Sequence, residues 1–277
     1  MNPLSAVISQ LQLTPPAAAA YQQLLLQLLN RLLALPRPAI IGISGAQGTG
    51  KSTLARALTE LLISQGIAAG SVSLDDYYLS KARRQQLAGN IHPLLAQRGV
   101  PGTHDIERAV NDAKTVLTGQ PVTLPQFAKA LDQPAAALAA QPLDILIVEG
   151  WCLGVQPQAA ADLARPVNQL EATEDSEGQW RHYVNQQLAG AYSRYWQLIK
   201  PLIWLQAPDW DCVCRWRAQQ EQQLWQQHGS GMNKAELARF MLPFQRLTQA
   251  SWQQLPAMAS YTVLLDQQQR PTLLAAD

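Results

Sequence analysis

The chain has 277 residues, enough for one large domain or two small ones that enclose a sizeable core. Its 21 basic and 20 acidic residues leave a formal net charge of +1, which gives no electrostatic basis for binding nucleic acid or an anionic membrane. Three cysteines do not suit a disulfide framework, and residues 1–13 show no signal-peptide pattern. We therefore expect a cytoplasmic protein.

Apolar runs and helical periodicity alternate along the chain. Residues 16–34 form the first predicted helix, because Leu25, Leu28, Leu29 and Leu32 recur at the spacing of one helix face. Short apolar runs predict five strands, at residues 39–44, 70–75, 144–150, 202–206 and 261–265. Further helices are predicted at residues 51–65, 81–97, 106–118, 211–227 and 233–254. This alternation indicates a three-layer α/β fold with helices on both faces of a parallel sheet.

A glycine-rich segment follows the first predicted strand. Residues 45–52 read Gly-Ala-Gln-Gly-Thr-Gly-Lys-Ser, which fits the phosphate-loop pattern G-x-x-x-x-G-K-[ST]. Glycines let successive N–H groups point at phosphates, and a helix that begins at Lys51 directs its positive dipole end at the same oxygens. We expect Lys51 to reach the β and γ phosphates of MgATP and Ser52 to bind Mg²⁺. The predicted nucleotide contacts are Gly45, Ala46, Gln47, Gly48, Thr49, Gly50, Lys51, Ser52 and Thr53.

Acidic residues stand at the ends of two other strands. Asp75 and Asp76 end the second strand, and Glu149 ends the third. Ligands of open α/β sheets bind beyond the carboxyl ends of the strands. Asp75 can therefore accept a proton from a substrate hydroxyl or hold Mg²⁺ through water, and Glu149 would help to hold the metal. A helix cap or turn is the alternative role for Asp75 and Asp76.

Two absences narrow the class of nucleotide-binding protein. The GTPase motif Asn-Lys-x-Asp does not occur, since residues 233–236 read Asn-Lys-Ala-Glu. No Asp-x-x-Gly switch follows the second strand. The chemistry that remains is phosphoryl transfer to a small hydroxyl compound.

Several segments resemble known kinases. Residues 42–53 and 73–79 resemble the group of uridine kinase, phosphoribulokinase and pantothenate kinase. The plant-type D-glycerate 3-kinase family and its uncharacterised bacterial P-loop kinase relatives are more similar, through residues 98–105, 149–154, 180–185, 216–221 and 231–232. These segments are distributed across nearly the whole chain, from residue 39 to residue 266.

This resemblance implies a fold and a domain organisation. It implies a P-loop NTPase fold with a five-stranded parallel sheet of order 2-3-1-4-5, and ATP and Mg²⁺ as cofactors. One kinase domain would span residues 1–277, with an N-terminal helical segment at 1–37, an insertion or helical region at 154–200 and lid-side helices at 211–254. Within the insertion, residues 154–180 lack a clear period and carry Glu171, Glu174, Asp175 and Glu177, so we expect them on the surface.

The resemblance also implies roles for single residues. It makes Asp75 the base and gives substrate contacts to Tyr78, His104 and Asp105. Arginines of the late helices would clamp the transferred phosphoryl group: Arg217 as a catalytic residue, Arg215 on the nucleotide, and Arg246. A solvated helix face is the alternative for these arginines.

One stretch departs from the family pattern. Family members commonly have Pro-Arg-Phe-Asp-Lys where residues 125–129 read Pro-Gln-Phe-Ala-Lys, so that only Lys129 remains as a charged substrate contact. D-Glycerate is the leading acceptor, and another small hydroxyl compound is the alternative. Gln126 and Ala128 also favour a second hypothesis, a nucleotide-binding switch or accessory protein without transfer. A third is a nucleoside or pantothenate kinase, with Tyr77, Tyr78 and Trp151 around the acceptor.

Overall fold

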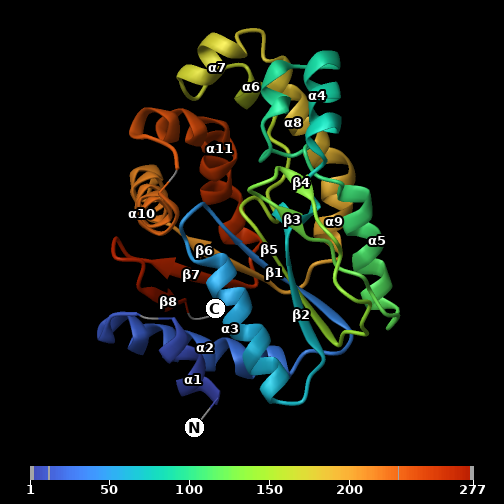
Figure 1. Cartoon of the computed structure of the whole chain (residues 1–277), viewed down its shortest axis with the longest axis vertical. Coiled ribbons are helices and arrows are strands. Elements are labelled where there is room, and N and C mark those ends of the chain that lie inside the picture. The colour runs from blue at the N-terminus through green and yellow to red at the C-terminus, as the bar shows by residue number, and fades with distance from the viewer. Residues whose placement is uncertain (1–2, 12, 230, 275–277) are drawn as a thin grey trace.

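The computed structural model describes residues 3–11, 13–229 and 231–274, and a six-stranded sheet forms its centre (Figure 1). Five strands run parallel, in the order β2 (Ala69–Ser73), β5 (Ile145–Gly150), β1 (Ala39–Gly45), β6 (Leu202–Gln206) and β7 (Tyr261–Leu265). The predicted five-stranded sheet therefore needs a correction, because β8 (Pro271–Leu273) adds an antiparallel edge strand beside β7. Three residues are too few to give an apolar pattern that predicts a strand.

Helices cover both faces of the sheet. One face carries α1 (Pro3–Gln10), α2 (Pro15–Leu33), α3 (Lys51–Ser64) and α10 (Trp210–His228). The other carries α5 (Ile106–Leu117), α8 (Gln179–Gln187) and α9 (Ser193–Gln197), while α11 (Lys234–Gln254) packs into both cores. Among the described helices, none is both long and apolar enough to cross a lipid bilayer.

Alternation along the strands creates the two cores. In β1, Ile40 packs into the core under α5, whereas Ile41 and Ile43 pack into the core under α3. Every residue of β1 and β5 is buried, which explains why both strands read as continuous apolar runs. Each fully buried Ile or Leu side chain contributes about 1.5–3 kcal/mol, so the central strands hold the three layers together.

The predicted helix at residues 81–97 is two elements. The helix α4 (Lys81–Asn90) ends before a short 3₁₀ helix at Pro93–Ala96. Pro93 lacks a backbone N–H and cannot continue a helix interior, which accounts for the break. Residues 1, 2 and 12 of the predicted N-terminal segment 1–37 lie outside the described residues.

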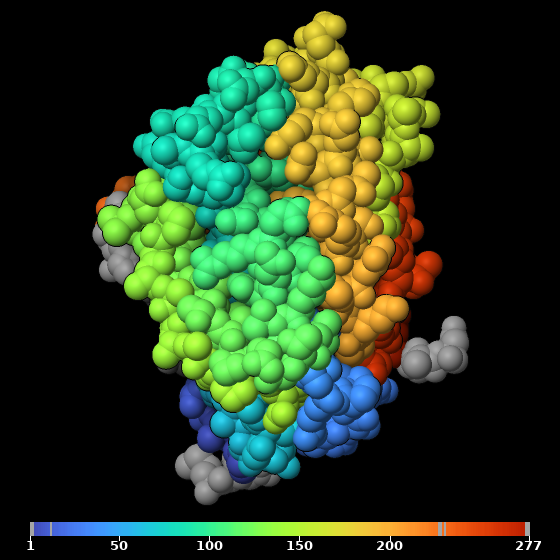
Figure 2. Space-filling model, turned by 90° about the vertical axis from the view of Figure 1, so that its right-hand side faces the viewer, coloured from blue at the N-terminus to red at the C-terminus, as the bar shows by residue number. Residues whose placement is uncertain are grey.

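The face that carries α5 and α9 also bounds a large cavity far from the phosphate loop. Figure 2 shows this face, with α5 in green, α9 in orange and the chain near residue 36 in blue below them. These segments line a cavity of about 720 Å³ at the amino ends of β1 and β6. Lys200 is the one charged side chain among the described residues that line it, so the cavity offers little chemistry.

Residues 154–180 are not a surface insertion throughout. They form two short helices, α6 (Ala160–Leu163) and α7 (Gln169–Glu174), and two of their acids are buried, Glu171 at 1% and Asp175 at 2% exposure. Asp175 accepts a hydrogen bond from Arg181 at 2.9 Å. Glu171 accepts two from Arg246, at 2.8 and 2.6 Å. The acids are internal because each finds an arginine on another helix.

That pairing corrects the clamp role predicted for Arg246. Its guanidinium is buried and also donates to the backbone oxygens of Asp162, at 2.9 Å, and Arg165, at 2.6 Å. Arg246 therefore ties residues 160–171 to α11, and it does not line the cavity at the phosphate loop.

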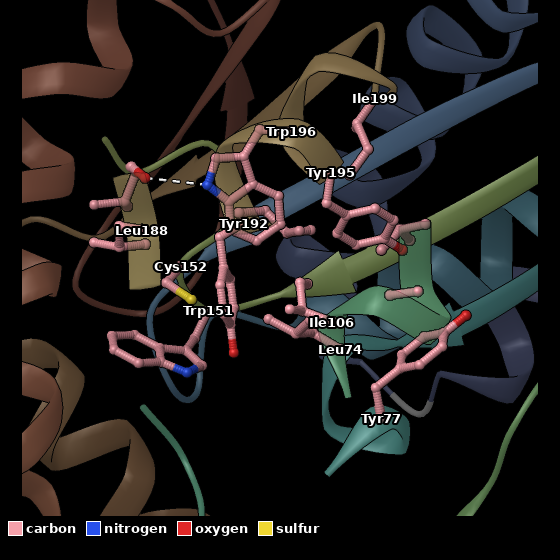
Figure 3. Close-up of a cluster of buried hydrophobic side chains, with 14 of the residues drawn as sticks. Leu74, Tyr77, Ile106, Trp151, Cys152, Leu188, Tyr192, Tyr195, Trp196 and Ile199 are labelled. Atoms are coloured by element: carbon pink, nitrogen blue, oxygen red, sulfur yellow. Dashed lines mark hydrogen bonds between the residues drawn. The ribbon is translucent and has the colours of Figure 1, made fainter. Parts of the chain in front are cut away.

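Large aromatic side chains fill the core next to the end of β5. Figure 3 shows Trp151, Cys152, Tyr192 and Trp196 in this region, and Trp196 donates a hydrogen bond to the backbone oxygen of Val155 at 3.1 Å. These bulky side chains leave little freedom for the chain that follows Glu149. The end of β5 is therefore a rigid support for the residues of the site.

Candidate active site

A cavity of about 530 Å³ opens at the carboxyl ends of β1, β2 and β5. It brings together residues that the sequence predicts to act at one site. Those that line it are Gln47, Gly48, Gly50, Lys51, Ser52, Thr53, Asp75, Tyr78, Lys129, Glu149 and Arg217. The remaining loop residues Gly45, Ala46 and Thr49 do not line the cavity, and the hydroxyl of Thr49 donates to the backbone oxygen of Ala46 at 2.8 Å.

The phosphate loop has the backbone that its glycines predict. Gly48 and Gly50 have φ angles of 78° and 85°, in the left-handed region that favours glycine. A Cβ atom at Gly48 would lie 2.7 Å from the Cβ of Trp216, so this position also has no room for a side chain. Gly50 is the N-cap of α3, and the helix begins at Lys51 with its N–H groups towards the cavity.

Lys51 lies between the loop and the acids. Its Nζ donates to the backbone oxygen of Ala46 at 2.9 Å. Burial lowers the pKa of Lys51, and the carboxylates of Glu149 and Asp75 oppose that shift. An ammonium group held in this way is suited to the β and γ phosphates of a nucleotide.

Ser52 and Glu149 form the predicted metal side of the site. The hydroxyl of Ser52 donates to Oε1 of Glu149 at 2.7 Å. Both groups offer hard oxygen ligands, which Mg²⁺ prefers together with water and phosphate oxygens. Among the described residues, no group of three or more His, Cys, Asp or Glu side chains could hold a metal by itself. The pair therefore fits an ion that also takes phosphate ligands.

Asp75 and Asp76, adjacent in sequence, have different roles. Asp76 accepts hydrogen bonds from the backbone N–H groups of Ser73, at 3.0 Å, and Phe127, at 3.2 Å, so the cap or turn role holds for this residue. Asp75 faces the cavity, where Tyr78 donates to Oδ1 at 2.8 Å and Lys129 to Oδ2 at 2.7 Å.

The surroundings of Asp75 keep its carboxylate ionised. Burial acts to raise the pKa of Asp75, but the ammonium of Lys129 and the hydrogen bond from Tyr78 outweigh it and hold the pKa below its ordinary value of 3.8. Burial and the neighbouring Asp75 raise the pKa of Tyr78 well above its ordinary value of 10.0, so Tyr78 stays a donor. Near neutral pH, Asp75 is thus available as a proton acceptor.

His104 and Asp105 support the site without lining the cavity. The ring of His104 stacks on that of Tyr78, with centroids 4.5 Å apart, and Nδ1 lies 2.6 Å from the hydroxyl of Tyr192. Burial lowers the pKa of His104 to about 4, so the ring is neutral near pH 7. The carboxylate of Asp105 accepts from the N–H of Arg108 at 3.3 Å and caps α5, which corrects its predicted role as a substrate contact.

The two arginines predicted on α10 point to different places. Arg217 lines the cavity. Its Nη2 lies 2.6 Å from Oε2 of Glu221, and its guanidinium carbon lies 5.7 Å from the ring centroid of Phe240. Arg215 is exposed and donates to the sulfur of Cys212 at 2.8 Å, outside the cavity. Two positions along a helix are about 200° apart, so only one of this pair can face the nucleotide. The predicted nucleotide contact at Arg215 is therefore corrected.

Arg98 is the charged lining residue that the sequence motifs do not single out. Its guanidinium donates to Oδ1 of Asp132 and, at 3.3 Å, to the backbone oxygen of Lys129. The signal was the position of Arg98 at the head of the glycine-rich segment 98–105, but its partner lies 34 residues away and no local pattern points to it.

Known proteins are similar to this chain over most of its length. No protein-family model matches it. The chain is 34% identical over 218 residues to the uncharacterized kinase mug58 of Schizosaccharomyces pombe, across 74% of this chain and 78% of that protein. It is 30% identical over 221 residues to the chloroplastic D-glycerate 3-kinase of Arabidopsis thaliana, across 74% of this chain and 45% of that protein.

A solved structure shares the fold. The D-glycerate 3-kinase of Cryptococcus neoformans var. grubii superposes with a TM-score of 0.74 over 94% of this chain and 99% of that one, at 22% identity. The match to mug58 over most of both chains and the geometry of the phosphate loop both indicate a P-loop kinase. The chain therefore belongs to the family of P-loop kinases that contains mug58 and the chloroplastic D-glycerate 3-kinase.

Proposed function

We propose that this ATP-dependent small-molecule kinase phosphorylates a hydroxyl group of D-glycerate. One observation carries the proposal: a single cavity holds Lys51 at the phosphate loop, the Ser52–Glu149 pair and the ionised carboxylate of Asp75. Among the described residues, four positively charged and two negatively charged side chains line this cavity. Its net positive charge favours a nucleotide together with a small anionic acceptor.

In the proposed reaction, Asp75 accepts the proton that the acceptor hydroxyl loses as its oxygen bonds to the γ-phosphorus of ATP. The bond from that phosphorus to the β,γ-bridging oxygen breaks, and ADP leaves. Lys51 and Arg217 counter the charge on the γ-phosphoryl oxygens. Mg²⁺ held beside Ser52 and Glu149 would neutralise phosphate charge when bound. The ammonium of Lys129 keeps Asp75 ionised until the acceptor hydroxyl replaces Lys129 as a hydrogen-bond donor to the carboxylate.

The nucleoside or pantothenate hypothesis has less support. Of the three aromatic residues expected around such an acceptor, Tyr78 and Trp151 line the cavity. Tyr77 does not, since its hydroxyl donates to Asp112 at 3.1 Å and its ring is buried in the core under α5. The name of one relative reported above, D-glycerate 3-kinase, also favours a sugar acid over a nucleoside.

An acceptor panel tests the proposal. ADP release from MgATP is measured with D-glycerate, L-glycerate, glycerol, uridine and pantothenate. We expect D-glycerate to stimulate release most strongly. Stimulation by uridine or pantothenate alone would contradict the proposed acceptor while leaving the kinase class intact. Release that none of the five compounds increases would favour the nucleotide-binding switch or accessory protein.

A further inference from the structure

A small hairpin outside the main sheet stands beside the acceptor end of the cavity. Its strands are β3 (Phe127–Ala128) and β4 (Gln133–Pro134), and the turn between them carries Lys129 and Asp132. Asp132 has a φ angle of 53°, in the left-handed region, which is uncommon for a residue with a side chain. Such a conformation persists when its surroundings determine it, and here two arginines hold the carboxylate.

Arg84 is the inner of these two arginines. Its side chain is 2% exposed, and Nη2 donates to Oδ2 of Asp132 at 2.5 Å. Nε donates to the backbone oxygen of Ala96 at 3.2 Å, and Nη1 to that of Leu79 at 2.6 Å. Each of its three nitrogens already has an acceptor inside the protein. Arg84 therefore anchors Asp132 and is not available to a ligand in the cavity.

Arg98 is the outer arginine, and it lines the cavity. Its Nη1 donates to the second oxygen of the same carboxylate, and its Nη2 to the backbone of Lys129. The guanidinium also lies 5.5 Å from the ring centroid of Phe127, so three contacts fix its direction. Within the described chain these bonds use two of its five N–H groups, and its side chain is 31% exposed.

The hairpin turn and its two arginines keep an unbalanced positive charge. Two guanidinium groups share the one carboxylate of Asp132, so the cluster of Arg84, Asp132 and Arg98 keeps a net charge of +1. Lys129, in contrast, is paired with Asp75 at 2.7 Å. Arg98 is thus the cation on the acceptor side whose charge is least cancelled. Tyr78 donates a hydrogen bond to Asp75, and burial and Asp75 raise the pKa of Tyr78. The positive charge of Arg98 is near enough to Tyr78 to oppose this rise.

We propose that Arg98 is a specificity-determining residue that binds the carboxylate of the acceptor, and that Asp132 is the positioning residue that sets the direction of its guanidinium. The inference rests on the proposed function. A guanidinium matches a carboxylate with two parallel hydrogen bonds, and the acceptor hydroxyl then reaches Asp75 from the same cavity. The stretch from Gln126 to Ala128 carries no charged side chain, so that the nearby ion pair of Arg98 and Asp132 is the place where a carboxylate finds a guanidinium.

Steady-state kinetics with D-glycerate and with glycerol, its uncharged counterpart, test the inference. We expect Arg98→Gln to raise KM for D-glycerate about 10- to 100-fold, because charge-assisted hydrogen bonds to the carboxylate are lost. The kcat and the KM for ATP should stay within about threefold, since the phosphate loop is unchanged. Arg98→Lys should recover part of the loss, because a single ammonium keeps the charge but not the fork.

Two further variants separate positioning from mere charge. Asp132→Asn should raise KM for D-glycerate in the same direction but less than Arg98→Gln does, with kcat again unchanged. Arg83→Gln removes an exposed arginine of α4 next to Arg84 and is the matched control. It should behave as wild type. Thermal unfolding of each variant confirms that it is folded, and Arg98→Lys decides the matter if Arg98→Gln does not fold.

The failure of this inference differs from the failure of the proposed function. If wild type uses D-glycerate and Arg98→Gln has the same KM as Arg83→Gln, the assignment of Arg98 is wrong and the function stands. If wild type phosphorylates neither compound, the proposed acceptor is wrong. Calorimetric titration of D-glycerate in the presence of a non-hydrolysable ATP analogue then decides: binding that Arg98→Gln weakens supports the assignment, and any other result overturns it.

Discussion

The nucleotide half and the acceptor half of the cavity are built in different ways. The phosphate loop is one continuous segment, and contacts within it, such as the bond from Lys51 to Ala46 five residues earlier, help to set its shape, while Ser52 at its end bonds to the distant Glu149. The acceptor half depends on pairs far apart in sequence: Lys129 reaches Asp75 across 54 residues and Arg98 reaches Asp132 across 34. The nucleotide half can therefore be recognised from a motif, whereas the acceptor half exists only once the chain is folded.

Loss of the base should separate the two halves most sharply. We expect Asp75→Asn to lower kcat by about 10²–10⁴, because a positioned general base contributes that much to the rate. Affinity for ATP should change only a few-fold, since the phosphate loop stays intact. Single-turnover rates and nucleotide titration measure the two effects. Asp211→Asn, at an exposed position of α10, is the control. Full activity in Asp75→Asn would mean that another group takes the proton.

The buried pair of Arg246 and Glu171 should matter to stability and to neither half of the cavity. Arg246→Met leaves a buried carboxylate without its partner and should lower the free energy of unfolding by about 3–5 kcal/mol. Arg239→Met breaks the pair with Glu174, which is exposed at 42% and 44%, and should cost less than about 1 kcal/mol. Denaturant unfolding measures both. A folded Arg246→Met protein whose kcat is strongly reduced would revive the clamp role of Arg246.

The pH dependence of activity should sharpen the contrast within the acceptor half. The pKa of Asp75 lies below 3.8, so protonation of this base should not limit kcat/KM near neutral pH. Lys129→Met removes the principal group that lowers this pKa, and burial is then free to raise it. The acid limb of the pH–rate profile should consequently move to higher pH. Lys114→Met, at an exposed position of α5, is the control, and an unmoved limb in Lys129→Met would contradict the role of Lys129.

The smallest effect is expected where the chain departs from its family. Gln126 is exposed and does not line the cavity. Gln126→Arg should therefore change KM for D-glycerate by less than about threefold, which is the range of a surface substitution. Kinetics beside wild type measure this. A large decrease in KM would mean that the family's arginine position, and not Arg98, is the better site for the acceptor carboxylate.

Sequence patterns predict the elements that depend on local order. The fully buried strands β1 and β5 appear as apolar runs, and the glycines of the loop predict its positive φ angles. Asp75 and Glu149 could be placed in the site because carboxyl ends of parallel strands meet at one edge of the sheet. These features need no knowledge of distant partners.

Other features depend on partners that no local pattern reveals. Arg246 sits on a late helix at a position that suits a phosphate clamp, yet its partner Glu171 lies 75 residues earlier in a stretch without periodicity. Arg98 meets Asp132 in the turn of a hairpin whose strands have only two residues each, too few for a sequence pattern to predict. The different roles of Asp75 and Asp76 likewise depend on Phe127, because its N–H donates to the carboxylate of Asp76 and holds it away from the cavity. Each outcome is decided by tertiary contacts.

The most direct measurement is ³¹P NMR of a reaction that contains wild-type protein, MgATP and D-glycerate. We predict that a phosphate monoester of glycerate forms in step with ADP, and that Asp75→Asn forms neither product at a comparable rate. ADP that forms equally fast without D-glycerate, with inorganic phosphate as the other product, would contradict transfer to this acceptor.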